Sequence, residues 1–268
     1  MYTIRPDVIC FSYCVTFLIC VSMALEREPW ERFIMRLSDF LFPPRCPICD
    51  KVLAVDSNHI PHEKCQKKVF PIVEPYCLKC GKPILHSEYE FCSVCATSKH
   101  HFTEGRCVFL YENALKHSMY LFKYGGRLEY ANWYVSSTVQ MYGDWVKKIH
   151  PDLILPVPMY YKKRRRRGYN QAEVYGRLLG KVLGIPCIPS LASRVRDTTP
   201  QKELSLEQRK KNLRNAFHIS ENVVEYRRIL LVDDIYTTGS TLDSLSVALR
   251  ELGVKNIFFL CICTGKIF

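Results

Sequence analysis

The stretch RRILLVDDIYTTGST, residues 227–241, decides how this chain folds. Its apolar run Ile229–Val232 predicts a buried parallel strand, and the acidic pair Asp233 and Asp234 follows the run directly. Beyond the turn, leucines recur at spacings of three, four and three residues over Leu242–Leu252, which predicts one apolar face of a helix. A strand, two carboxylates, a turn and a helix N-terminus in this order form a plausible site for a phosphorylated sugar.

The turn between this strand and this helix is rich in hydroxyl groups and contains one glycine. Backbone N–H groups and the positive end of the helix dipole favour a phosphate there, while the carboxylates suit a neighbouring diol or a divalent cation. The alternative is an ordinary strand–helix turn capped by Ser240 or Thr241. The chain has neither a G-x-x-x-x-G-K-[ST] nor a G-x-G-x-x-G pattern, which excludes those two phosphate-binding loops. The residues expected to surround the phosphate are Thr237, Thr238, Gly239, Ser240 and Thr241.

This arrangement resembles the phosphoribosyl-pyrophosphate (PRPP) motif of type I phosphoribosyltransferases. The resemblance implies that Asp233 and Asp234, as catalytic-site acids, bind the ribose 2′- and 3′-hydroxyls, and that Thr237–Thr241 wraps the 5′-phosphate. It also implies Mg2+ bound together with PRPP. In a transferase of this kind, PRPP loses pyrophosphate through an oxocarbenium-like state, and cations neutralise the leaving group.

From Gly105 onward, short apolar runs alternate with amphipathic runs of helix length. This alternation predicts an α/β fold with a doubly wound parallel sheet, whose ligand lies beyond the carboxyl ends of the strands. The predicted strands cover Arg106–Tyr111, Leu153–Val157, Ile185–Ile188, Ile229–Val232 and Asn256–Cys263. The predicted helices cover Ala114–Tyr124, Leu128–Lys148, Asn170–Leu183 and Leu242–Leu252.

A run of cations occupies the predicted loop Pro158–Gly168, after the second predicted strand. Residues 160–228 contain 17 lysines and arginines and 6 acidic residues. The resulting net charge of +11 is nearly all of the chain's net charge of +12. Such a surface implies a polyanionic partner: pyrophosphate, nucleic acid or both. Arginine presents a planar fork to phosphate oxygens, and the resemblance assigns Arg165 and Arg167 to PRPP. The cations of the run are Lys162, Lys163, Arg164, Arg165, Arg166 and Arg167.

Only one or two of these six cations could reach a single small ligand, so the others are either solvated or bind something longer. A groove that follows phosphates and stacks bases needs cations and aromatic rings together. Tyr160, Tyr161 and Tyr169 flank the run, although core packing is an equal alternative for them. We therefore expect single-stranded DNA as a partner of the basic run and Tyr169.

Eight of the residues between positions 46 and 95 form four pairs of metal-ligand type, each with two residues between its members. Two such pairs close a tetrahedral structural zinc (Zn2+) site. The simplest pairing gives one three-cysteine–histidine site and one four-cysteine site; cross-pairing stays open, and His59 could replace His62. Disulfides are the competing account, but they require an oxidising compartment. The pairs are Cys46 and Cys49, His62 and Cys65, Cys77 and Cys80, and Cys92 and Cys95.

A module this short, with few long apolar runs, needs more than burial to fold. Zinc would supply folding free energy on the order of 10 kcal/mol per site, and the absence of an obvious open position favours a structural role. Four further cysteines stand in apolar runs and are predicted to be buried core thiols. They are Cys107, Cys187, Cys261 and Cys263.

Residues 1–25 form an apolar leader. Val8–Leu25 is at the lower limit of length for a membrane span, and its flanking charge is weak for a signal peptide. We expect residues 1–22 to lie outside the functional protein, with Met23 as a natural start. The alternative is a membrane anchor, and only then would a membrane be a partner.

Three features together resemble the ComF family of competence proteins: the zinc-knuckle module, the PRPP-like turn and an R-x-R-G-[YF]-N-Q pattern over Arg165–Gln171. Lys123 and Arg127 also stand in matching places, whereas His62 stands where many relatives carry a cysteine. A further stretch has the family's R-x-x-x-T-x-x-Q pattern and the residues that follow it. In this chain these are Arg194, Thr198, Gln201, Leu204, Arg209, Asn212 and Phe217.

The resemblance implies a zinc-binding module over residues 40–100 and a phosphoribosyltransferase-like domain over residues 105–268. It implies a cytoplasmic protein of natural competence and DNA transformation that binds PRPP or a related phosphorylated ribose, with single-stranded DNA and other competence proteins as partners. The alternative is an active phosphoribosyltransferase of nucleotide metabolism that uses PRPP and Mg2+, because a pure DNA binder has no need of two diol-binding carboxylates. No residue pattern names an acceptor base.

Overall fold

The computed structural model describes residues 43–54, 57, 59–196 and 216–265. The predicted leader, residues 1–25, lies outside the described residues, and so do Thr198, Gln201, Leu204, Arg209 and Asn212 of the family pattern. Within the described ranges, no helix is both long enough and apolar enough to cross a membrane.

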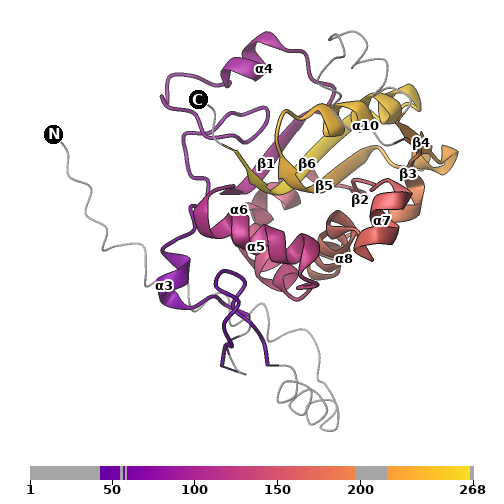
Figure 1. Ribbon diagram of the computed structural model, residues 1–268. Helices are drawn as coiled ribbons and strands as arrows, with labels where there is room; N and C mark the ends of the chain where they lie inside the picture. The colour runs from indigo at the N-terminus through magenta and orange to yellow at the C-terminus, as the bar shows by residue number, and fades with distance from the viewer. Residues whose placement is uncertain (1–42, 55–56, 58, 197–215, 266–268) are drawn as a thin grey trace, which may run out of the picture. The chain divides into compact units, whose positions relative to one another are not determined.

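Four parallel strands form the central sheet in the order β1–β6–β5–β2 (Figure 1). Their inner residues are almost all buried, as expected of a parallel sheet that is covered on both faces. The parallel α/β fold predicted from the sequence is confirmed. The bounds are Glu104–Leu110 for β1, Leu153–Pro156 for β2, Arg228–Tyr236 for β5 and Asn256–Thr264 for β6.

Helices cover both faces of this sheet, with α5, α6 and α8 on one face and α10 on the other (Figure 1). The side chains of β5 explain why both faces are covered, because successive side chains of a strand point to opposite faces of the sheet and apolar ones occur on both. Leu230 and Val232 pack in the cluster that contains α6 and α8, whereas Ile229 and Leu231 pack with Leu245 of α10. The helices span Asn113–Tyr124 (α5), Tyr130–Ile149 (α6), Gln171–Leu183 (α8) and Ser240–Glu251 (α10).

The chain winds in opposite directions from the neighbouring strands β2 and β5. After β2, helix α8 leads to Cys187, which bridges to Ile154 of β2 in parallel fashion. After β5, helix α10 leads to β6 on the other side of β5. The crevice beyond the carboxyl ends of β2 and β5 is therefore the topological switch point, where ligands of doubly wound sheets bind.

The structure corrects three details of the predicted elements. β5 does not end at Val232 but continues to Tyr236, because Asp233 still pairs with Cys261 of β6. The predicted loop Pro158–Gly168 contains a short helix, α7 (Tyr161–Arg167), which the left-handed Gly168 ends. The predicted strand at residues 185–188 is reduced to the single bridge at Cys187, which is half-buried; the other three cysteines predicted as core thiols are buried.

Short elements complete the described chain. Two one-turn helices lie in the cysteine-rich region: α3 (Glu63–Gln66) and α4 (Ser93–Thr97). The antiparallel pair of β3 (Ala192–Arg194) and β4 (Phe217–Ile219) packs against α10 through β4. Two 3-10 helices cover Pro189–Leu191 (η1) and Glu221–Glu225 (η2).

Candidate functional site

The predicted acidic pair lies at the carboxyl end of β5, beside the switch point. The backbone N–H of Asp234 donates to Oδ1 of Asp233 at 2.8 Å. Burial and the neighbouring charge of Asp234 raise the pKa of Asp233 to about 7. Neighbouring carboxylates that are largely buried are an unfavourable arrangement unless a cation or hydroxyl donors accompany them.

Lys123 supplies such a cation from the last turn of α5. Its Nζ lies 2.8 Å from Oδ2 of Asp234, and the two side chains are only 17% and 16% exposed. Burial alone would lower the pKa of Lys123, but the charge of Asp234 and the hydrogen bond to it outweigh burial and raise the pKa. Sequence reasoning noted Lys123 only as a family match and gave it no role, because no local pattern connects α5 with β5.

The hydroxyl-rich turn leads from β5 to the first residue of α10, Ser240. Gly239 has φ +77°, and a Cβ there would lie 2.5 Å from Oη of Tyr236, so only glycine fits. Thr238 Oγ1 lies 2.8 Å from Ser240 Oγ. Gly239 is the N-cap and has no side chain to cap α10, so the N-cap is neither Ser240 nor Thr241. The N–H of Ser240 donates instead to Thr238 Oγ1, at 3.4 Å. Backbone N–H groups at a helix start and hydroxyl groups such as these are the donors that phosphate-binding turns use.

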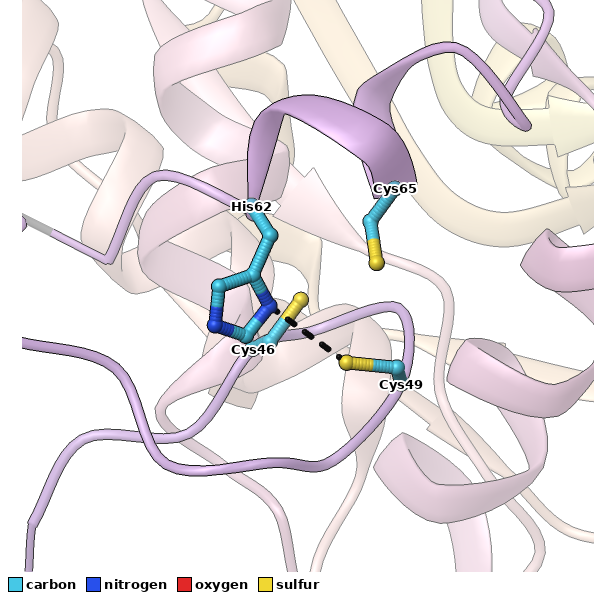
Figure 2. Close-up of side chains that lie close together, drawn as sticks. All are labelled: Cys46, Cys49, His62 and Cys65. Atoms are coloured by element: carbon cyan, nitrogen blue, oxygen red, sulfur yellow. Dashed lines mark hydrogen bonds between the residues drawn. The ribbon is translucent and has the colours of Figure 1, made fainter.

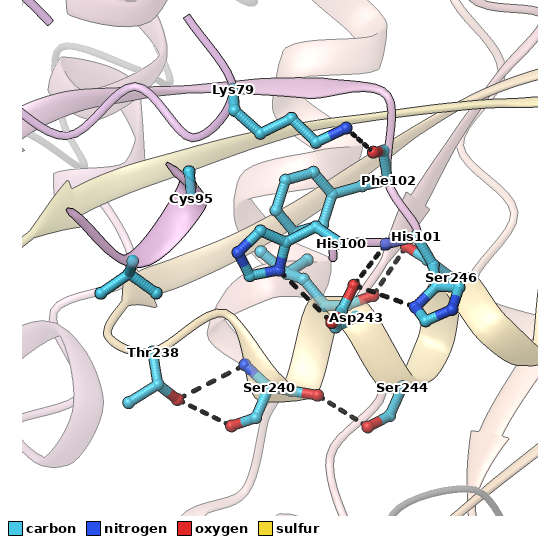
Figure 3. A network of polar contacts seen from close by, with 12 residues as sticks. Lys79, Cys95, His100, His101, Phe102, Thr238, Ser240, Asp243, Ser244 and Ser246 are labelled. Atoms are coloured by element: carbon cyan, nitrogen blue, oxygen red, sulfur yellow. Dashed lines mark hydrogen bonds and ion pairs between the residues drawn. The ribbon is translucent and has the colours of Figure 1, made fainter. Parts of the chain in front are cut away.

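Asp243 in the first turn of α10 is bound by the segment before β1 (Figure 3). The backbone N–H of His101 donates to Asp243 Oδ1 at 2.6 Å, and His100 Nδ1 lies 3.3 Å from Oδ2. Burial would raise the pKa of Asp243, but these hydrogen bonds outweigh it and lower the pKa. The contacts fix the start of α10, and sequence reasoning missed them because the partners are far apart along the chain.

The predicted basic run forms helix α7, on which Arg164, Arg165 and Arg166 are exposed. Arg167 at its end donates to Gln171 Oε1 at 2.6 Å and to the hydroxyl of Tyr124 at 2.9 Å. Of the two arginines assigned to PRPP, Arg165 is therefore exposed, and Arg167 contacts protein groups. Lys162 is exposed and Lys163 half-buried, while Tyr169 donates its hydroxyl to the backbone carbonyl of Phe122.

The first group of predicted metal ligands converges as the simplest pairing expects (Figure 2). All four ligand atoms lie within 4.8 Å of one another. Cys49 Sγ and His62 Nδ1 are 3.4 Å apart, close to the separation of about 3.6 Å of sulfur and nitrogen ligands on a tetrahedral zinc ion. Backbone N–H groups lower the pKa of Cys46 to about 7 against the effect of burial, which suits a thiolate ligand. The group consists of Cys46, Cys49, His62 and Cys65.

The second group also lies within 4.8 Å and is more deeply buried. Cys80 Sγ and Cys92 Sγ are 3.8 Å apart, which equals the separation of about 3.8 Å of two thiolates on tetrahedral zinc. No fifth position is provided, so each group fits zinc as a structural ion that would be held by these side chains alone. The group consists of Cys77, Cys80, Cys92 and Cys95.

Comparison with known proteins places these features in a family. A model described as "Double zinc ribbon domain" matches residues 37–107. Competence protein F of Haemophilus influenzae is 33% identical over 219 residues, which cover 80% of this chain and 93% of that protein. The chain belongs to the ComF family. The double-zinc-ribbon match and the convergence of the eight ligands indicate structural zinc in this member of the family.

Two further relatives agree with the assignment to the ComF family. Competence protein ComFC of Bacillus subtilis is 27% identical over 225 residues, which cover 78% of this chain and 89% of that protein. DNA utilization protein YhgH of Escherichia coli K12 is 35% identical over 113 residues, which cover 42% of this chain and 49% of that protein.

Proposed function

We propose that this chain binds PRPP, or a related phosphorylated ribose, together with Mg2+, and that it handles single-stranded DNA in competence or DNA utilisation. The observation that carries the ligand proposal is the meeting of an acidic pair, a hydroxyl-rich turn and the first turn of α10 at the switch point of the sheet. The thiol-rich zinc ribbons suit a reducing compartment, so we propose the cytoplasm as its location.

The proposed roles follow from the chemistry of each group. Asp233 and Asp234 accept hydrogen bonds from the ribose diol, and Thr237–Thr241 with the first N–H groups of α10 bind the 5′-phosphate. Lys123 orients the carboxylate of Asp234 through their ion pair at 2.8 Å. Mg2+ would be held by the phosphate oxygens and the acidic pair, and Arg165 would compensate the charge of the pyrophosphate.

The DNA part of the proposal is supported by charge and by the names of relatives. Proteins named for competence and for DNA utilization match this chain. Helix α7 presents Arg164, Arg165 and Arg166 to solvent, which is more positive charge than one pyrophosphate requires. A long polyanion such as single-stranded DNA has enough phosphates to contact all three arginines.

Isothermal titration of the full-length chain with PRPP and Mg2+ tests the ligand proposal. Asp233→Asn combined with Asp234→Asn should abolish saturable binding while the protein keeps its fold by circular dichroism. Asp144→Asn is the matched control, because Asp144 is a fully solvated acid on α6. Equal affinity of the wild-type protein and the double variant would remove the ligand proposal.

The salt dependence of binding to single-stranded DNA tests the basic helix. Replacing Arg164–Arg167 by serine should reduce the slope of log affinity against log salt by about 0.7 for each phosphate that the variant no longer neutralises. An unchanged slope would show that α7 does not contact DNA.

The second candidate function is an active phosphoribosyltransferase, which the intact acidic pair favours. In that reaction the bond from ribose C1 to pyrophosphate breaks, a bond to an acceptor base forms, and pyrophosphate leaves. Release of pyrophosphate from PRPP in a screen of nucleobases, abolished in the Asp233→Asn variant, would establish it; binding without release would restrict the chain to binding.

A further inference from the structure

Two large aromatic side chains lie one turn apart on the solvent face of α5. Tyr120 and Tyr124 are 60% and 59% exposed, and their ring centroids are 5.4 Å apart. The opposite face of the same helix buries Leu115, Met119 and Phe122 in the core. Folding therefore has no need of these two rings, and a pair of exposed aromatic faces indicates a binding surface.

Cations flank the two rings on both sides. Lys116 lies one turn before Tyr120 on the same face of α5, is exposed, and stands 5.9 Å from the ring centroid of Tyr111. Beyond the other ring, the guanidinium carbon of Arg167 lies 4.6 Å from the centroid of Tyr124. These five residues form a surface of three rings and two cations, here named the α5 stripe: Tyr111, Lys116, Tyr120, Tyr124 and Arg167.

The α5 stripe is continuous with the basic helix and adjoins the acidic pair. Arg167 is the last residue of α7, and Gln171 just beyond it donates to the backbone carbonyl of Lys123 at 3.3 Å. Lys123 precedes Tyr124 and turns inward to Asp234. A ligand on the stripe would therefore reach the basic helix at the same end of α5 that borders the proposed ribose site.

We propose that the α5 stripe is a base-stacking platform for single-stranded nucleic acid, with bases on Tyr120 and Tyr124 and backbone phosphates at Lys116 and Arg167. The proposal rests on the DNA part of the proposed function and deepens it. Exposed ring faces stack on bases only when the bases are unpaired, and cations on either side of the two rings suit the phosphates that flank the stacked bases. Neither α5 nor α7 contains an acidic residue, which suits a polyanion. The carboxylate of Glu173 in α8 pairs with Arg164 at 3.2 Å, so Arg165 and Arg166 are the cations of α7 that such a polyanion would meet first.

The test compares two strands that differ only in their bases. Fluorescence anisotropy of the full-length chain is measured with a labelled oligothymidylate of about 20 nucleotides and with an abasic strand of the same length. The wild-type protein should prefer the strand that has bases. Tyr120→Leu with Tyr124→Leu should weaken binding to oligothymidylate by about tenfold for each tyrosine and leave the affinity for the abasic strand unchanged.

The matched control is Tyr89→Leu, because Tyr89 is also 60% exposed but lies in the second zinc ribbon. It should bind both strands as the wild-type protein does. An oligouridylate distinguishes the two kinds of strand: tighter binding of oligothymidylate assigns the stripe to DNA, and equal binding assigns it to single strands of either kind.

Two results would overturn the proposal. If the double tyrosine variant binds oligothymidylate as tightly as the wild-type protein, or is weakened by the same factor on both strands, the rings do not stack on bases, while the DNA part of the proposed function stands. If the wild-type protein binds no oligothymidylate, that part fails together with the stripe, and the titration with PRPP still tests the ribose site separately.

Discussion

The two zinc ribbons form the same turn but attach to the α/β domain by different means. In the first ribbon, the backbone N–H of Cys46 donates to the backbone carbonyl of Lys51 at 2.8 Å. In the second, the backbone N–H of Cys77 donates to the backbone carbonyl of Lys82 at 2.7 Å. The residue after the second cysteine has positive φ in both turns, 57° at Asp50 and 70° at Gly81. An aspartate tolerates this region better than most residues do, and a glycine enters it without strain.

The difference at this one position decides how each ribbon is held. Asp50 reaches the corner between α5 and α6, where Arg127 Nε lies 2.9 Å from its Oδ1 and the hydroxyl of Tyr130 donates to the same oxygen at 2.6 Å. Gly81 instead lets the backbone of the second ribbon contact the backbone of β1, because a Cβ there would lie 2.7 Å from Arg106 Cα. Another polar side chain could replace the contact that Asp50 makes. The contact between the two backbones, in contrast, requires glycine at position 81.

The attachments also lead to different parts of the proposed site. The first ribbon holds the corner that follows Lys123, the partner of Asp234. The second ribbon places Lys82 over the ring of Tyr236, at 5.4 Å from the centroid, and Tyr236 lies against Gly239 in the turn before α10. The first ribbon thus supports the surroundings of the acidic pair, and the second ribbon supports this turn.

The largest expected effect is that of Cys77→Ser, because it removes a fully buried ligand of the second ribbon. Structural zinc contributes on the order of 10 kcal/mol per site, so loss of this ion should unfold the ribbon and lower the Tm of the whole domain. Zinc content by mass spectrometry should fall by one ion per chain. Cys46→Ser should also lose one ion but lower the Tm less, because the first ribbon is tethered through side chains. A Cys77→Ser variant that stays folded without its zinc would contradict the structural role.

Gly81→Ala tests the contact between backbones. The added Cβ would clash with β1, and neither backbone can move without disturbing the sheet, so the free energy of unfolding should fall by about 3 kcal/mol or more. Gly126→Ala is the matched control, because Gly126 has φ +69° but no atom within 4 Å of the added Cβ. It should cost only about 1 kcal/mol, from the positive φ alone. If urea denaturation gives the same decrease in the free energy of unfolding for both variants, the positive φ alone accounts for both, and the contact between the backbones contributes nothing.

Asp50→Asn has the smallest expected effect and tests the polar tether. The amide keeps the shape and one hydrogen bond but loses the charge opposite Arg127, so unfolding should become easier by about 1 kcal/mol. Asp144→Asn, at an exposed ion pair with Lys147, should change the free energy of unfolding by nearly zero. If the two variants are equally stable, the Asp50 tether contributes nothing.

The sequence predicted what depends on local pattern. The buried strand at Ile229–Val232 and the helix after the turn follow from the spacing of apolar residues. The eight metal ligands form the two groups that are expected when each pair joins the next pair along the chain. Helix α7 could not be predicted in this way, because a run of six cations has no apolar period. The partners Lys123 with Asp234, and His101 with Asp243, meet only after the sheet has formed.

The central claim is that the carboxyl end of β5 and the start of α10 form the ligand site, while the ribbons only support it. Hydrogen–deuterium exchange of the full-length chain with and without PRPP and Mg2+ tests this claim directly. The account predicts slower exchange of the backbone N–H groups at residues 237–243, where the phosphate would accept hydrogen bonds, and no change at residues 46–53 of the first ribbon. Unchanged exchange at residues 237–243 in the presence of saturating PRPP, or protection confined to the ribbons, would contradict it.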